Sequence, residues 1–235
     1  MDKNVPELTI SDRFVAWYDA NKQQALLGVL ILILVGIGFG YLVWHSSEKD
    51  MEAGEALTSV TLAHANAGGG LNAGAHDALL KVANEYPNSK AGARARLLAA
   101  GNLFVDAKYD QARAEFEKFT RDYKDSPYLG EALLGIAACY DAQGKTNEAV
   151  SAYNNFIEHH AGEPGIPQAK FSLARLYEGQ GKPDKAQLLY TDVERAEPGS
   201  TLGTEAGMRV EELKQKFPNL ASVTIPASTN LLQIK

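Results

Sequence analysis

The chain has 235 residues, a formal net charge of −6 and a hydrophobic fraction of 45%. Its 23 basic residues against 29 acidic ones argue against nucleic acid as a partner, because binding phosphates requires a basic face. The single cysteine permits no disulfide within the chain, which suits either redox compartment and decides neither.

Residues 1–24 form a polar segment with one short amphipathic helix. Ile10, Phe14, Trp17 and Tyr18 recur at helical spacing and would place their apolar side chains on one face. Such a helix can lie on the headgroups of a membrane. Either interfacial anchoring by the aromatic rings or contact with a membrane partner would explain it.

Residues 25–44 contain no charged side chain. A helix of this length rises about 30 Å, which matches the hydrocarbon core of a bilayer. Tyr41 and Trp44 lie at its end, where aromatic rings favour the headgroup layer. The long polar N-terminus argues against a cleaved signal peptide, and no cysteine ends the run as a lipoprotein would require. We therefore expect one permanent transmembrane helix.

Small residues and flanking charges add two expectations about this helix. Gly28, Gly36 and Gly40 fall close to one face, and the last two have the spacing that allows neighbouring membrane helices to approach. They are candidate membrane helix-packing residues. Three basic residues precede the span and only Lys49 occurs in the twenty residues after it. This bias predicts that the N-terminus is cytoplasmic and that the large C-terminal part lies on the other side of the membrane.

The remainder of the chain is an internal repeat of 37 residues. Three rows share the spacing i, i+4, i+7 within each unit, which is one face of a helix. These rows are Ala75, Ala112, Ala149 and Ala186; Leu79, Phe116, Tyr153 and Tyr190; and Val82, Phe119, Phe156 and Val193. A fourth row consists of Ala63, Ala100, Ala137 and Ala174. Alanines would let paired helices approach closely, while the aromatic rings fill the space between units.

Turn residues recur in the same register. The turn between two helices of a unit is marked by Gly70, Ala107, Gly144 and Gly181. Three residues later stand the expected N-caps Asp110, Asn147 and Asp184, while the first unit has Ala73 there and Asn72 one place early. Between units, Ser126 is expected to cap the next helix, with Pro127 in its first turn.

These patterns predict an all-α fold. A right-handed α-solenoid would occupy 45–217, and the tail 218–235, which has lost the repeat, would be flexible or dock onto the solenoid or a neighbour. The helices are expected at 46–66, 74–86, 91–106, 110–124, 128–143, 147–160, 166–180, 184–196 and 202–217. No Gly or Pro occurs from Tyr41 to Ala53, so the transmembrane helix could continue into the first repeat helix.

The segment from Leu133 to Ala149 resembles the tetratricopeptide repeat, with Tyr140, Gly144, Ala149 and, just beyond it, Tyr153 at signature places. Its period is three residues longer than the usual 34. The segment from Phe116 to Tyr128 resembles the longer variant of bacterial envelope proteins. Together with one span and the N-terminal PheValAlaTrpTyrAspAlaAsnLys motif, the layout is similar to the ancillary subunit of the bacterial Sec translocon. That resemblance implies a small inner-membrane protein with a periplasmic repeat domain.

The inner face of such a solenoid is lined mainly by the first helix of each pair. One inward row is apolar throughout and reads Val60, Leu97, Leu134, Phe171 and Met208. Beside it fall Arg94, Phe104, Glu131, Asp141, Arg175 and Glu178. This set is the candidate surface for binding extended polypeptide or a helix, and packing between neighbouring first helices is the alternative for the apolar row.

No catalytic, cofactor or metal site is expected. Gly144-Lys145-Thr146 lacks the leading glycine and the strand of a phosphate loop. His159 and His160 are adjacent on a helix, so their rings diverge too far to share a metal easily. Cys139 has no nearby base or ligand spacing and is expected to pack between helices.

The favoured interpretation is a non-enzymatic interaction module. Its resemblance implies assistance to protein export beside the Sec channel and handover to periplasmic chaperones. An envelope scaffold for cell division, outer-membrane assembly or pili, with one folded partner, is the alternative. A small-molecule binding protein fits less well, because open solenoids seldom enclose a concave pocket.

Overall fold

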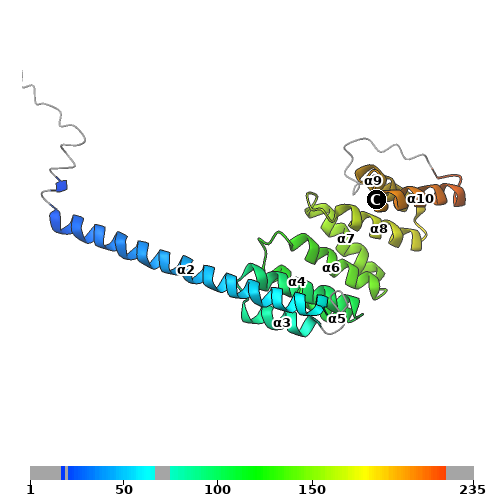
Figure 1. Cartoon of the computed structure of the whole chain (residues 1–235). Coiled ribbons are helices and arrows are strands. Elements are labelled where there is room, and N and C mark those ends of the chain that lie inside the picture. Colours follow the sequence, from blue (N-terminus) through cyan, green and yellow to red (C-terminus); the bar gives the residue numbers. More distant parts are fainter. Residues whose placement is uncertain (1–16, 19–20, 67–74, 221–235) are drawn as a thin grey trace, which may run out of the picture. The chain divides into compact units, whose positions relative to one another are not determined.

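The computed structural model describes residues 17–18, 21–66 and 75–220, without the side chains of residues 25, 39–47 and 64–66 (Figure 1). Trp17 and Tyr18 are about half exposed, while the rest of the expected amphipathic helix lies outside the described residues. The chain divides into two units, Met1–Glu52 and Ala53–Lys235. Each is described by itself.

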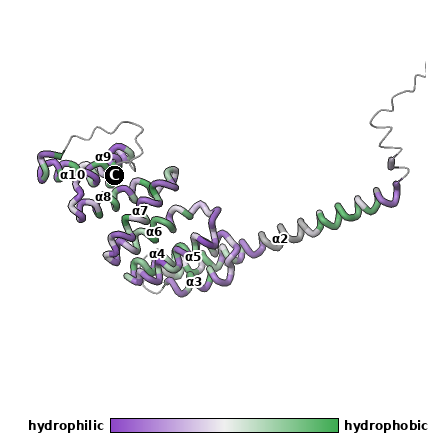
Figure 2. Tube along the Cα trace, turned by 180° about the vertical axis from the view of Figure 1, so that it is seen from behind, coloured by the Kyte–Doolittle hydropathy of each residue, from purple (hydrophilic) through white to green (hydrophobic). Residues whose placement is uncertain are grey.

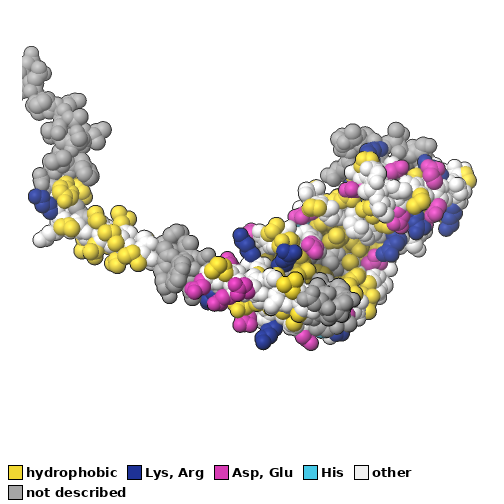
Figure 3. All heavy atoms as spheres, viewed as in Figure 1, with side chains coloured by type: hydrophobic (Ala, Val, Ile, Leu, Met, Phe, Trp, Pro, Cys, Tyr) yellow, Lys and Arg dark blue, Asp and Glu magenta, His cyan; other side chains and the backbone are white. Residues whose placement is uncertain are grey.

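The first long element, α2 (Lys22–Asn66), is one uninterrupted helix of 45 residues. It contains both the segment 25–44 and the first expected repeat helix, and no proline removes a donor from its backbone. Its N-terminal part is strongly apolar and its C-terminal part polar (Figure 2). Every described large apolar side chain from Leu26 to Ile37 is at least half exposed (Figure 3).

The expected membrane features of α2 are only partly described. Over the described residues, no helix has the combination of length and hydropathy required to cross a bilayer. A Cβ added to Gly28 or Gly36 would meet nothing within 4 Å, so neither glycine is required by contacts within this chain. The surroundings of Gly40 lie outside the described side chains. The transmembrane helix stays a prediction.

The second unit is an array of helical hairpins in which each helix from α3 to α10 packs against the next (Figure 1). Its helices are α3 (Ala75–Glu85), α4 (Lys90–Val105), α5 (Tyr109–Asp122), α6 (Leu129–Ala142), α7 (Thr146–His159), α8 (Ile166–Gly179), α9 (Pro183–Ala196) and α10 (Thr201–Lys216). Within the described residues the architecture is all-α, as expected, and the helix boundaries agree with the predicted ones to within a few residues.

The repeat rows form the core of this unit. All twelve members of the three helical rows that begin with Ala75, Leu79 and Val82 are at most 6% exposed. Ala100, Ala137 and Ala174 are fully buried, whereas Ala63 is exposed and departs from its row. The buried side chains divide into three clusters that follow one another along the array. The core is therefore built unit by unit.

The turn residues are confirmed, but the expected helix caps are wrong. Ala107, Gly144 and Gly181 have φ of +59°, +69° and +69°, which ends each preceding helix in the left-handed conformation. The next helix begins two residues later, so Asp110, Asn147 and Asp184 lie inside its first turn. The N-cap position is instead held by lysine, which makes no side-chain cap. The first-unit turn (Gly70, Asn72 and Ala73) lies outside the described residues.

Serine caps occur between units rather than within them. Ser89 and Ser200 accept hydrogen bonds from the backbone N–H of Gly92 and Gly203, at 2.8 and 3.0 Å. The prediction for Ser126 was wrong by two residues, because Tyr128 is the N-cap of α6 and the Ser126 hydroxyl accepts from the Tyr128 N–H, which precedes the helix. Pro127 thus lies before the helix.

The left-handed turns give a stability prediction. Replacing Gly144 or Gly181 with alanine should lower the free energy of unfolding by about 1 kcal/mol, because a Cβ disfavours positive φ. Ala107→Gly should raise it by about 0.5 kcal/mol, since the relief of strain exceeds the extra entropy of the unfolded chain. Urea unfolding followed by circular dichroism measures both.

The matched control is the same chemical change within a helix. Ala114→Gly on the exposed face of α5 should destabilise by about 1 kcal/mol. A loss of similar size for Ala107→Gly would contradict the assignment of strain to this turn.

Candidate functional site

A pocket opens where the first helices of three consecutive hairpins meet. Its volume is about 360 Å³, and its lining comes from α4, α6, α7 and α8: Phe104, Ala138, Asp141, Ala142, Tyr153, Ser172 and Arg175. The lining is apolar apart from the Ser172 hydroxyl, the Tyr153 phenol and one pair of charged groups. The pocket is large enough for one or two side chains of a partner.

The charged pair joins two hairpins. An Arg175 guanidinium nitrogen donates to the carboxylate of Asp141, which is largely buried while Arg175 is largely exposed. Behind the pair, burial raises the pKa of Tyr153 to about 12, and a hydrogen bond with Ser172 opposes that shift. Tyr153 is therefore a neutral part of the pocket floor, and Arg175 supplies an exposed cation beside an apolar surface.

Three of the predicted site residues, Phe104, Asp141 and Arg175, are thus brought together. Two other predicted residues, Phe171 and Glu178, both contact Tyr190 of α9. The Phe171 ring packs edge-on against Tyr190, with 5.2 Å between the ring centroids, and the Tyr190 hydroxyl lies 3.3 Å from the Glu178 carboxylate. Burial raises the pKa of Tyr190, so this hydroxyl is a donor. The Phe171 and Glu178 side chains are occupied by contacts with α9.

The apolar row has a graded exposure. Leu97 is buried, and Val60, Leu134 and Phe171 are half-buried and pack against the core clusters. Met208, the last member, is 57% exposed. Arg94 and Glu131 are exposed in the N-terminal parts of α4 and α6 and do not line the pocket. The predicted surface is therefore not one continuous groove.

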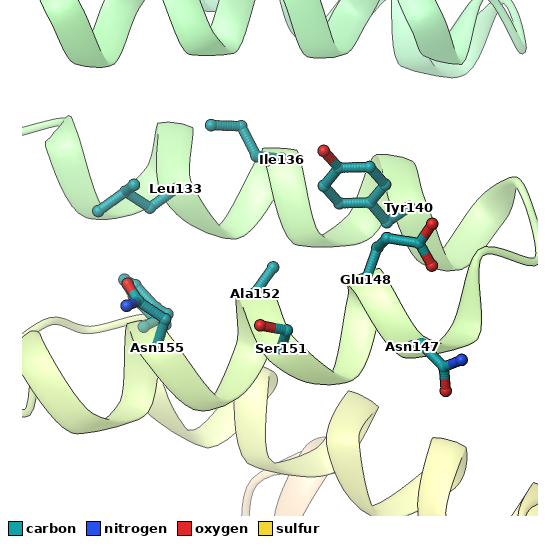
Figure 4. Close-up of a pocket in the computed structure, with 9 residues that line it drawn as sticks. Leu133, Ile136, Tyr140, Asn147, Glu148, Ser151, Ala152 and Asn155 are labelled. Carbon is teal, nitrogen blue, oxygen red and sulfur yellow. The ribbon is translucent and has the colours of Figure 1, made fainter.

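A second hollow, of about 570 Å³, lies between α6 and α7 and was not anticipated from the sequence (Figure 4). Apolar side chains of α6 (Leu133, Ile136 and Tyr140) line one wall, and side chains of α7, most of them polar, line the other. The polar wall consists of Asn147, Glu148, Ser151 and Asn155. Such a surface can bury an apolar side chain and hydrogen-bond to the backbone that carries it.

The unit that contains this hollow lacks an ion pair that both neighbouring units have. Arg96 pairs with Glu115 between α4 and α5, and Lys170 pairs with Asp192 between α8 and α9. The residue at the same repeat position as Arg96 and Lys170 is Leu133. Comparing charges across the repeat register, rather than apolar rows alone, would have revealed this exception.

No reactive constellation is found among the described residues. No group of three His, Cys, Asp or Glu side chains could hold a metal ion there. Cys139 is fully buried between helices, as predicted, and burial raises its pKa to about 11. Its thiol is therefore protonated and inaccessible at neutral pH.

Comparison with protein families identifies the chain. The family model described as a tetratricopeptide repeat-like domain matches residues 15–155, which is more than half of the sequence. The chain belongs to this family. The match begins before the uncharged segment 25–44 and therefore includes it together with the first repeats. The fold is accordingly that of a protein–protein interaction module.

Solved structures agree with this repeat fold. MamA matches with a TM-score of 0.50 and 18% identity, over 77% of this chain and 100% of its own. PcrH, in complex with the chaperone binding region of PopD, has a TM-score of 0.43 and 21% identity, covering 50% and 86%. A putative kinesin light chain of Podospora anserina has 0.48 and 14%, covering 72% and 85%. At 18% identity, the match to MamA shows a likeness of fold alone. No curated protein matches.

The missing ion pair gives a second prediction. Leu133→Lys alone should destabilise the tetratricopeptide repeat-like domain by about 1–2 kcal/mol, because it removes apolar packing. Adding Asn155→Asp would place a Lys and an Asp at the repeat positions of Lys170 and Asp192. The new ion pair should recover about 1 kcal/mol of the lost free energy of unfolding. A double-mutant cycle by urea unfolding measures this coupling. Additive effects of the two substitutions would contradict the repeat-register explanation.

Tyr153 gives a prediction for alkaline pH. Its folded pKa of about 12 exceeds the ordinary value of 10, so its contribution to stability is complete below pH 10 and is lost as the pH rises to about 12. Tyr153→Phe cannot ionise. Unfolding free energies measured from pH 8 to 12 should therefore fall less steeply for this variant, by about 2 kcal/mol at the alkaline end. Parallel curves would exclude Tyr153 as a source of the pH dependence.

Proposed function

We propose that this protein is a non-enzymatic interaction module anchored in a bacterial inner membrane, with its repeats in the periplasm. It assists protein export beside the Sec translocon and passes emerging chains to periplasmic chaperones. The observation that carries the proposal is the single helix α2, which contains both an uncharged, exposed apolar segment and the first helix of the repeat array.

The exposed apolar side chains of α2 would be unfavourable in water, so we expect a membrane or a protein to cover them. From Leu26 to Ile37 the large apolar side chains point away from the helix in all directions, and none of them is buried by the rest of the chain. Contiguous apolar surface of this extent marks a membrane or protein contact. Of these two, a bilayer explains the segment better, because residues 25–44 lack charge and basic residues are more frequent before them than after them.

The pocket between α4, α6 and α8 supports a polypeptide partner. It offers an apolar floor with an exposed guanidinium at its edge, and its volume of about 360 Å³ can hold one or two side chains of a bound segment. The hollow between α6 and α7 adds apolar and hydrogen-bonding groups in one place. Shallow pockets of this kind suit weak binding of varied extended segments.

Anchoring would make weak binding sufficient. A pocket tethered near the channel exit encounters an emerging segment at a high effective concentration, so no high intrinsic affinity is needed. Weak binding also permits release to a chaperone. The family match, which takes in residues before and within the uncharged segment, is consistent with a fixed combination of anchor and repeats.

Photocrosslinking in cells tests the proposal. A photoreactive amino acid replaces Phe104 or Arg175 in the full-length protein, with exposed Glu158 on α7 as the control position. At the two pocket positions we expect many adducts with exported chains, which increase when export is slowed. At the control position these adducts should be several-fold weaker.

Two results would contradict the proposal. One defined adduct from the pocket positions would favour an envelope scaffold with a single folded partner. Extraction of the full-length protein by alkaline carbonate, or full protection of the repeats from protease added to spheroplasts, would refute the anchor and its orientation.

A further inference from the structure

The last described helix has a face that its counterparts cover with a second helix. α4, α6 and α8 each pack against the helix that follows, and α10 is the final helix of the described part. Phe171 of α8 packs on Tyr190 of α9, whereas Met208, its counterpart one repeat later, is 57% exposed. Among the residues described up to 220, no following helix covers this face.

A helix of the repeat's own kind does not suit the face. The position of the fully buried Ala100, Ala137 and Ala174 is occupied in α10 by Glu211, which is exposed. Packing an apolar helix there would bury this carboxylate together with its exposed ion pair to Lys214, which is costly. The substitution selects for an occupant that brings positive charge.

The surroundings of Met208 are also rich in carboxylates. Two hollows of about 800 and 520 Å³ flank it, and their charged lining residues are Glu194, Glu205, Glu211, Glu212 and Arg209. Glu212 pairs with Arg209 at 3.2 Å and Glu211 with Lys214 at 2.7 Å. Glu194 and Glu205 have no ion pair among the described residues, so the lining is negative overall.

A glycine of α10 makes room for a carboxylate of α9 beside Met208. The Glu194 carboxylate lies over Gly207, where a Cβ would be only 2.8 Å from it. Glycine at 207 thus lets a carboxylate from α9 reach the side of Met208. An apolar anchor point surrounded by carboxylates results.

We propose that this face of α10 binds a basic amphipathic polypeptide segment of a partner protein, with an apolar side chain on Met208 and Lys or Arg side chains opposite Glu194 and Glu211. The surface is distinct from the pocket lined by Phe104 and Arg175, and the inference does not rest on the proposed function. The chain's own residues 221–235 fit less well, because they contain one basic residue, Lys235.

Two matched peptides test the proposal against the full-length protein in neutral detergent, with a detergent blank subtracted. One is an 18-residue helical peptide with leucines along one face and lysines elsewhere. The other has glutamates in place of the lysines. Fluorescence anisotropy should detect binding of the lysine peptide alone, and the affinity should fall at least tenfold between 50 and 500 mM salt.

Variants then locate the binding site. Met208→Gln should weaken binding about tenfold, and Glu194→Gln combined with Glu211→Gln about fivefold, with a reduced salt dependence. All three positions allow hydrophilic substitution, so folding is expected to be retained and is checked by circular dichroism. Val105→Gln, at another exposed apolar side chain, and Glu158→Gln are the matched controls and should change the affinity less than twofold.

Three results would overturn the proposal, two of them by showing that something other than a partner's basic segment occupies this face. Binding that appears only after residues 221–235 are removed would assign the face to the tail. Self-association that Met208→Gln abolishes would assign it to a second copy. Equal affinity of both peptides, or equal binding by all variants, would exclude a charge-selective site on α10.

Discussion

The close approach of paired helices at alanine is the constraint on which the repeat array depends. Ala75, Ala112, Ala149 and Ala186 are fully buried, and no larger side chain would allow the same separation of helices. The space left between units is then filled by large buried side chains such as Phe119, Tyr153 and Tyr190. Small and large residues therefore cannot be exchanged independently, and the period of 37 residues maintains their pairing.

Polar residues distinguish units that share this apolar pattern. Arg96 with Glu115 and Lys170 with Asp192 fill the space between two helices of their units. The middle unit has Leu133 instead and retains a hollow. The units are thus alike in their core and different at their surface, which is how a repeated fold acquires individual binding sites.

The sequence predicted the helical pairs well because their apolar rows repeat four times, as in the row from Leu79 to Tyr190. It predicted helix ends less well: Asp110 and Asn147 are good capping residues, yet they lie in the first turn because the left-handed residue before them closes the turn sooner. Side-chain chemistry alone does not reveal that backbone geometry.

The candidate site was harder to predict. Phe104, Asp141 and Arg175 come from different repeats, and their convergence depends on how successive hairpins pack. The apolar row around Leu97 and Phe171 could not be divided into core and surface, because both environments select the same residue types. The hollow lies beside Leu133, where the charged residue of the neighbouring units is missing, and a search for recurring residues overlooks such an exception.

The burial of Cys139 predicts how the folded protein would behave in an oxidising environment. A protonated thiol enclosed by helices cannot readily attack a disulfide or be oxidised to a sulfenic acid. The folded protein would therefore pass through such a compartment without forming mixed disulfides with other proteins. Only molecules that have not completed folding would expose the sulfur to oxidant, so a covalent adduct at this position would report incomplete folding.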